Sequence, residues 1–297
     1  MADGARAGRF TRSQAFSGYV MISPPFLYAV LMLGAPLVAV IVLSFLTDGS
    51  GGQRIIPEFT TANYAEAWAD PLNRLLWMRS VFVSLMVTLA TVILAFPIAY
   101  YISFVVRPEK KSLWLFLITI PFWTSYLIRV FLWKVILGYS GVVNSALLGL
   151  GIIDEPLQWI NYNVGAVILT LAHAYAPFAI LPIFVALEKI DRSLLEAGQD
   201  LGESKAMTFL RVTLPLAMPG VIGATLIVFI PTVGDYVTPQ LVGGPEGRLI
   251  ANMIQLQFLK LDNYPLGSAI SVTTMVIVGV ISLLFLLANR RFLRGQR

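Results

Sequence analysis

The sequence predicts an all-α polytopic membrane protein with six transmembrane helices. Of its 297 residues, 57% are hydrophobic and only 12% are charged, a balance typical of membrane proteins rather than of soluble domains. The apolar residues form long uncharged runs of roughly the 20 residues that a helix needs to cross the hydrocarbon core. Lipid cannot satisfy backbone polar groups, so each run is expected to be helical. One polytopic domain accounts for the chain.

Charge and cysteine content exclude several classes of function. The net charge of +5 would suggest nucleic-acid binding in a soluble protein, but here the basic residues flank apolar runs, so we exclude nucleic acid as a partner. The absence of cysteine excludes disulfides and thiolate metal sites, and we expect no bound metal. The sequence lacks G-x-x-x-x-G-K-[ST], so no P-loop binds ATP, and we expect no cofactor on this chain.

The first two spans are predicted over residues 19–46 and 80–106. The basic residues of the tail over 1–18 are followed by an apolar run that is too long for a signal-peptide core and lacks a small-residue cleavage pattern, so the first span is expected to remain uncleaved. Pro24 and Pro25 predict an entry bend or an interfacial turn near its start. A polar interval over 48–79 is expected to carry a short surface helix near residues 60–68.

The third span, predicted over 112–131, contains Pro121 in its middle, and Arg129 and Lys134 interrupt the apolar run near its end. An outer loop over 139–163 should contain a short amphipathic element between turns.

The remaining spans are predicted over 164–187, 217–236 and 267–288, with a second outer loop over 235–265. They complete a permease domain over 19–289, followed by a tail over 290–297. Prolines within spans two to five are either bends that line a water-filled pathway or packing kinks without functional consequence.

Basic residues predict the orientation of the bundle. Fourteen of the 21 Lys and Arg residues lie in the two tails, in the 107–111 loop and in the 188–216 loop. The positive-inside rule places these segments, including both termini, in the cytoplasm.

The 188–216 loop is the longest polar interval in the second half of the chain. Ser193 and Glu196 have the spacing of a capping box, which predicts a helix from Leu194. Gly202 should end this helix in the left-handed conformation. A second helix, capped by Ser204, should run to about Val212 and end at Pro215.

Ala197 and Gly198 would leave a nearly bare patch on the first of these helices, which another protein could approach closely. The alternative is an ordinary polar loop that happens to be helical.

The motif Glu196-Ala197-Gly198, with Gly202 four residues later and Leu214-Pro215 a dozen further, resembles the EAA loop of type I ABC-importer permeases. The chain departs from the family at Gly198, where Ala is usual. The resemblance implies the type I permease fold and a cytoplasmic coupling helix that docks on an ATPase. The coupling residues it implies are Glu196, Ala197, Gly198, Asp200, Leu201, Gly202, Leu214 and Pro215.

The stretches Phe229 to Gly244 and Leu249 to Phe258 resemble spermidine/putrescine importer permeases, although permeases for opines, iron and phosphonates share much of the pattern. This resemblance implies a transport subunit of the bacterial inner membrane, not an enzyme, that moves polyamines by alternating access. The implied partners are a cytoplasmic ATPase dimer that binds ATP and Mg²⁺, a second homologous permease, a periplasmic substrate-binding protein and membrane lipid.

Candidate pathway residues gather near the predicted outer end of span five. Asp235 is either a solvated or capping residue at the span end, or it faces the pathway and attracts a polyamine ammonium group. Tyr236, together with Trp123 and Tyr126, could add cation–π contacts. His173 is either a core histidine with a hydrogen-bond partner or a pathway residue.

Three other classes of function were weighed. Gly138-Tyr139-Ser140-Gly141 matches the G-x-S-G pattern of rhomboid proteases, and His173 lies in the next span, but Ser140 falls in a predicted outer loop. An ion-coupled secondary transporter would need intramembrane ionisable relays, and spans two, four, five and six carry only His173. A purely structural subunit would not need a coupling helix.

Overall fold

A computed structural model describes residues 3–49, 55–158, 160 and 162–294, without the side chains of residues 3–15 and 294. Five of its helical segments are long and apolar enough to cross a membrane, and a bent helix pair raises the number to six. The predicted α-helical membrane fold is therefore confirmed. The five segments are Phe16–Leu43, Pro71–Phe104, Val164–Glu188, Lys205–Val233 and Tyr264–Ala288.

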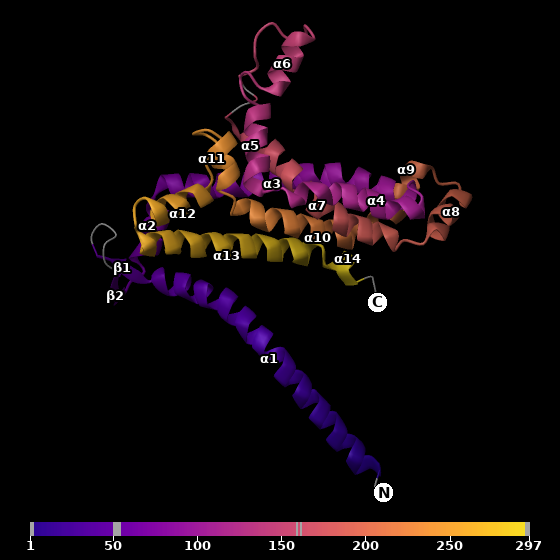
Figure 1. Cartoon of the computed structure of the whole chain (residues 1–297), viewed down its shortest axis with the longest axis horizontal. Coiled ribbons are helices and arrows are strands. Elements are labelled where there is room, and N and C mark those ends of the chain that lie inside the picture. The colour runs from indigo at the N-terminus through magenta and orange to yellow at the C-terminus, as the bar shows by residue number, and fades with distance from the viewer. Residues whose placement is uncertain (1–2, 50–54, 159, 161, 295–297) are drawn as a thin grey trace.

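Three helices form the centre of the bundle, namely α3 (Pro71–Phe104), α7 (Val164–Glu188) and α10 (Leu214–Val233). Small side chains let them approach closely: a Cβ on Gly220 of α10 would lie 2.5 Å from the Cβ of Ala186 on α7. Such close approach favours helix association in lipid, where the hydrophobic effect cannot drive it. α13 (Tyr264–Ala288) runs alongside the centre (Figure 1).

α1 (Asp3–Leu43) leaves this bundle (Figure 1). Only its C-terminal end approaches α13, and the apolar window within Phe16–Leu43 is 0% buried. Pro24 and Pro25 lie inside this continuous helix, so neither of them forms the predicted interfacial turn. Each proline removes one backbone hydrogen bond without ending the helix.

The polar interval after α1 is more ordered than the sequence indicated. It contains an antiparallel hairpin of β1 (Leu46–Asp48) and β2 (Ile55–Phe59), and then α2 (Ala62–Ala69). The helix that carries the predicted second span begins at Pro71, nine residues before that span, because the Asp70 side chain accepts a hydrogen bond from the backbone N–H of Leu72 and Pro71 occupies the first turn.

The third span is not one straight helix over 112–131. α4 (Pro108–Thr119) passes through the 3₁₀ turn η1 (Ile120–Trp123), and α5 (Tyr126–Ile136) then leaves at 88°. Pro121 lies in this turn. α5 extends past the predicted end because Arg129 and Lys134 sit within it as helical residues rather than as terminators.

The remaining elements are short. α6 lies beyond α5, away from the body of the bundle, whereas most of the others lie at its two ends (Figure 1). α8 and α9 lie at one end, and α2, α12 and the hairpin lie at the opposite end, called the far end below (Figure 1). α11 and α12 occupy the predicted loop over 235–265, and α12 is too short to cross a bilayer. Their bounds are α6 (Val142–Gly149), α8 (Arg192–Asp200), α9 (Lys205–Thr208), the π turn η2 (Phe209–Thr213), α11 (Val237–Val242), α12 (Ile250–Leu259) and α14 (Arg290–Arg294).

Candidate functional site

The loop that follows α7 carries α8, which begins two residues earlier than predicted. Asp191, not Ser193, caps it: the Asp191 carboxylate accepts a hydrogen bond of 3.0 Å from the backbone N–H of Ser193. The predicted capping box of Ser193 and Glu196 is therefore wrong, since Ser193 already lies inside the helix. The Ser193 N–H holds the pKa of Asp191 below its ordinary value.

Gly202 closes α8 in the predicted left-handed conformation, with φ of +87°. The Glu203 N–H donates to the Gly198 carbonyl at 3.1 Å, and the Gly202 N–H donates to the Gln199 carbonyl at 2.9 Å. These two bonds form a Schellman motif, which satisfies the last carbonyls of the helix and fixes the turn.

The second helix of the loop starts as predicted but does not stop. The Ser204 hydroxyl accepts a hydrogen bond from the Met207 N–H at 3.3 Å and so caps α9. The chain then continues through η2 into α10, and Pro215 lies in the first turn of α10 rather than ending a helix. A proline is tolerated there because the first turn leaves backbone donors unpaired anyway. The loop is thus rigidly joined to the fifth span.

Gly198 faces inward, which corrects the prediction of a bare patch for a partner. A Cβ on Gly198 would lie 3.2 Å from Cγ2 of Thr208, which is buried on α9. The missing side chain thus lets α8 pack against α9 within the loop.

The predicted coupling residues fall into two groups. Glu196, Ala197, Asp200 and Gly202 are exposed, and Leu201 is 87% exposed at the tip of the loop. The others are half-buried: Gly198 lies against α9, and Leu214 and Pro215 begin α10. The exposed group, which combines acidic and apolar side chains, is the part available to another protein.

At the far end, Asp235 follows α10 and is only 8% exposed. Its carboxylate accepts hydrogen bonds from the backbone N–H groups of Val237 at 2.8 Å and Thr238 at 3.1 Å, and from the Thr238 hydroxyl at 2.9 Å. The Tyr126 hydroxyl of α5 donates a fourth hydrogen bond. Asp235 therefore caps α11 and ties it to α5; it is not a solvated span-end residue.

The aromatic residues predicted near Asp235 have different surroundings. Tyr126 is half-buried over the carboxylate, and the Arg129 guanidinium lies 5.8 Å from its ring centroid. Tyr236 is 42% exposed beside Asp235, whereas Trp123 is 82% exposed in η1. The structure thus brings Tyr126 and Tyr236 to Asp235. Among the described residues, Trp123 makes no hydrogen bond or ring contact with this group.

His173 is an exposed residue of α7 with a hydrogen-bond partner. Its Nδ1 accepts a hydrogen bond of 3.1 Å from the Trp133 indole of α5. It is therefore not a core histidine, and among the described residues this nitrogen pairs with tryptophan rather than with Ser140, which lies in the turn before α6. The arrangement does not support a serine protease.

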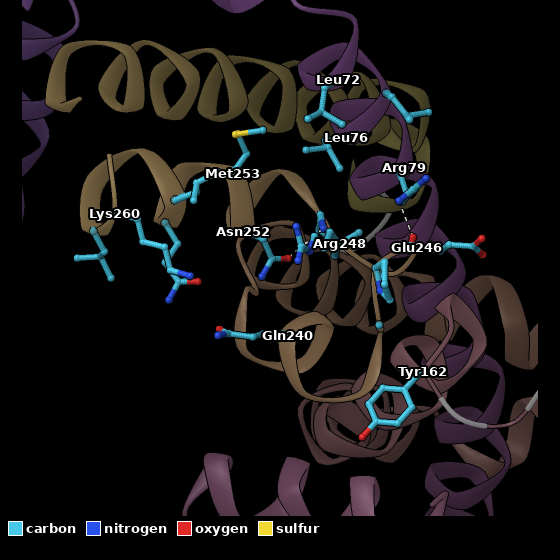
Figure 2. Close-up of a pocket in the computed structure, with 17 residues that line it drawn as sticks. Leu72, Leu76, Arg79, Tyr162, Gln240, Glu246, Arg248, Asn252, Met253 and Lys260 are labelled. Carbon is cyan, nitrogen blue, oxygen red and sulfur yellow. Dashed lines mark hydrogen bonds between the residues drawn. The ribbon is translucent and has the colours of Figure 1, made fainter. Parts of the chain in front are cut away.

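A groove of about 830 Å³ opens at the far end between the start of α3 and α12 (Figure 2). Leu72, Leu76 and Met253 contribute apolar walls, and Arg79, Arg248 and Lys260 contribute positive charge. The described residues provide no ion-pair partner for these three cations. Glu246 also lines the groove, and Arg79 donates to its backbone carbonyl, so three cations face one carboxylate. This excess of positive charge disfavours a cationic substrate such as a polyamine.

Several residues of these sites escaped the sequence analysis. Asp191 stands two positions before Ser193, and Thr238 three after Asp235; both spacings are typical of side-chain caps and could have been found. Thr208 acts through packing against Gly198, which no local pattern reveals.

Proteins similar to this chain can be aligned with it over most of the length of both sequences. The chain is 38% identical over 265 residues to the spermidine/putrescine transport system permease protein PotB of Escherichia coli (strain K12), covering 89% of this chain and 94% of that protein. It is 36% identical over 255 residues to the protein of the same name in Haemophilus influenzae, covering 86% and 88%.

Among solved structures, a bacterial ABC transporter that imports the polysaccharide alginate superposes with a TM-score of 0.68 at 18% identity, covering 96% of this chain and 98% of that one. This likeness shows the fold alone. The sequence profile of binding-protein-dependent transport system inner membrane components matches residues 82–297. With this match and the identities above, the chain belongs to that family, the multi-pass inner-membrane permease subunits of type I ABC importers, which are transport subunits rather than enzymes.

Proposed function

We propose that this chain is the permease subunit of a polyamine importer. The observation that carries the proposal is its identity of 38% over nearly nine tenths of its length to permeases of spermidine/putrescine systems. The match also covers 94% of the Escherichia coli relative, so the two proteins correspond over almost their whole length. Substrate would cross by alternating access, as the bundle opens in turn to either side of the membrane.

The end of the bundle that carries α8 is the cytoplasmic end in this proposal, and both termini lie on that side. The distribution of Lys and Arg supports this orientation. A cytoplasmic ATPase dimer would bind ATP and Mg²⁺ and would dock on the exposed residues of α8. Leu201, exposed at the tip, supplies the apolar contact that such an interface needs at its centre.

A second homologous permease completes the pathway. The apolar window of α1 is 0% buried, and α5 projects at 88° from α4 with Leu127, Ile128, Phe131 and Leu132 each more than half exposed. α5 also carries Arg129 and Lys134, so lipid alone would be a poor covering for it. A partner permease packed on α1 and α5 would bury these surfaces.

The substrate pathway would run past the aromatic face near Asp235. Tyr236 and Trp123 are exposed and can make cation–π contacts with an alkylammonium group. His173 lies on an exposed face of α7. Asp235 contributes long-range attraction rather than a direct contact, since four hydrogen bonds already occupy its carboxylate. A periplasmic binding protein would deliver the substrate, so weak binding in the permease suffices.

Transport in proteoliposomes tests the proposal. The chain is co-expressed with the partner permease, ATPase and binding protein of its transport system, and uptake of labelled putrescine and spermidine is measured with ATP inside or outside the vesicles. Saturable uptake that depends on ATP at the α8 side is expected. Competition by an opine, a phosphonate or a ferric chelate, without competition by polyamines, would overturn the substrate assignment.

A further inference from the structure

Five residues at the α8 end join four helices in one cluster, called the brace below. The Lys111 ammonium of α4 contacts both carboxylate oxygens of Glu188, the last residue of α7, at 2.6 and 2.8 Å. The Ser103 hydroxyl of α3 donates to the same carboxylate at 3.1 Å. Arg192, the first residue of α8, donates to the Ser103 carbonyl at 3.2 Å and lies over the Phe104 ring.

Burial makes the brace more than a surface ion pair. The Lys111 side chain is only 12% exposed, and Ser103 is 2% exposed, while Glu188 is 43% exposed. An ammonium held in this position needs its carboxylate, because an unpaired charge there would be poorly solvated. Lys111 and Glu188 are therefore expected to move together.

The connection between α7 and α8 is short and anchored. Only residues 189–191 separate the two helices, and Ile190 between them is 8% exposed in the core. At the other end of the loop, the Phe209 ring packs edge-on against Phe96 of α3, with centroids 5.5 Å apart. The loop that carries α8 is thus anchored to α3 at both ends, through Arg192 and through Phe209. A shift of the whole loop is therefore expected to move the helices of the bundle.

We propose that the brace is the positioning element that transmits displacement of α8 to the transmembrane helices α3, α4 and α7. This inference rests on the proposed docking of an ATPase on α8. Docking itself uses the exposed residues near Leu201, whereas the brace acts between that contact and the pathway. Breaking the brace should therefore uncouple ATP hydrolysis from transport without releasing the ATPase.

The test is a charge exchange in the assembled transporter. Lys111→Glu and Glu188→Lys are each expected to lower polyamine uptake per ATP hydrolysed by about fivefold or more, the low end of the range for allosteric coupling. The double variant, which restores the pair with reversed polarity, is expected to regain most of the loss. Lys110→Glu, at the exposed neighbouring position, makes the same charge change without breaking an ion pair and should couple normally.

Co-purification of the ATPase separates the two proposals. If the wild-type chain retains no ATPase, docking on α8 is wrong. If the ATPase is retained and the single variants couple like the wild type, or if the double variant fails to recover while folding normally, the brace does not transmit the movement.

Discussion

Gly198 of α8 lies against Thr208 of α9, and a Cβ at position 198 would come within 3.2 Å of the threonine methyl group. This contact folds the polar loop back on itself, and it gives the glycine an internal role. The outward side of the same helix turn carries Ala197, which is exposed. The two neighbouring small residues therefore differ in their surroundings: Gly198 shapes the loop, and Ala197 lies on the surface where the proposed partner would dock.

Substitutions at these two positions should distinguish the effect of the folding of the loop from the effect of ATPase binding. Gly198→Ala is expected to be tolerated, because the methyl group needs a shift of only a few tenths of an ångström and the helix gains up to about 1 kcal/mol in propensity. Gly198→Leu should force α8 from α9 and abolish stimulated ATP hydrolysis. Ala197→Leu should leave the loop folded but weaken ATPase binding, as measured by co-purification. Equal effects of the two leucine variants on binding would contradict this separation.

The turn at Gly202 should be intolerant of side chains. Its φ of +87° costs a non-glycine residue about 1–2 kcal/mol, so Gly202→Leu is expected to disrupt the Schellman motif and uncouple transport. Gly202→Asn should retain part of the activity because asparagine visits this conformation more readily. Substrate-stimulated ATP hydrolysis is measured, and membrane insertion of the variants is the control. Normal stimulation in Gly202→Leu would show that coupling does not need this turn.

Glu196→Ala should impair coupling through the partner rather than through folding. Asp191, not Glu196, belongs to the cap of α8, so removing the exposed Glu196 carboxylate leaves the helix start intact. Proteolysis of the loop should therefore match the wild type while ATPase affinity falls. Asp191→Ala is the converse variant: it should expose the loop to protease, and Asp191→Asn should preserve the cap. If the loop of Glu196→Ala is cleaved by protease as readily as the loop of Asp191→Ala, Glu196 acts through folding of the loop and not through the partner.

Topology reporters test the orientation of the bundle. Fusions after Lys111 and after Lys205 should report a cytoplasmic location, and a fusion after Glu246 should report a periplasmic one. The basis is the concentration of Lys and Arg at the α8 end. A periplasmic reading from the Lys205 fusion would invert the proposed topology and exclude docking of a cytoplasmic ATPase on α8.

The sequence predicted features that depend on one or two neighbouring residues. The left-handed turn at Gly202 and the cap at Ser204 follow from local backbone chemistry, and both are present. The role of Gly198 was misjudged, because a helical pattern does not say which side packs against the rest of the chain. Lys111 and Glu188 are 77 residues apart, so their pairing depends on how the helices assemble.

The bend in the third span shows the same limit. Pro121 indicated a weak point in that span, but not a turn of 88°. The direction of α5 is set by contacts with distant elements, including the hydrogen bonds from Tyr126 to Asp235 and from Trp133 to His173. Hydropathy alone also ended this span too early, because it cannot distinguish a charge that ends a helix from one that lies along it.

Asp235 offers the sharpest test of the polyamine pathway. Asp235→Asn keeps an oxygen to accept the Val237 and Thr238 N–H groups but removes the charge. An ammonium group about 8 Å away, at an effective dielectric constant near 20, is attracted by about 2 kcal/mol, so uptake at sub-saturating concentration should fall severalfold. Spermidine, with three charges, should lose more than putrescine.

The matched control is Asp262→Asn, which removes an exposed charge at the far end from a residue with φ of 51°, a conformation that asparagine accepts. It should leave uptake unchanged. Basal ATP hydrolysis of Asp235→Asn should stay near the wild type, since its backbone cap persists. Its thermal stability should fall modestly, because the amide nitrogen cannot accept the hydrogen bonds that the Tyr126 and Thr238 hydroxyls donate to the carboxylate. Tyr126→Phe should also lower stability, because it removes the hydroxyl donor over a carboxylate that is 8% exposed. If Asp235→Asn takes up both polyamines at the wild-type rate, the charge of Asp235 does not attract the substrate, and its role is only to cap α11.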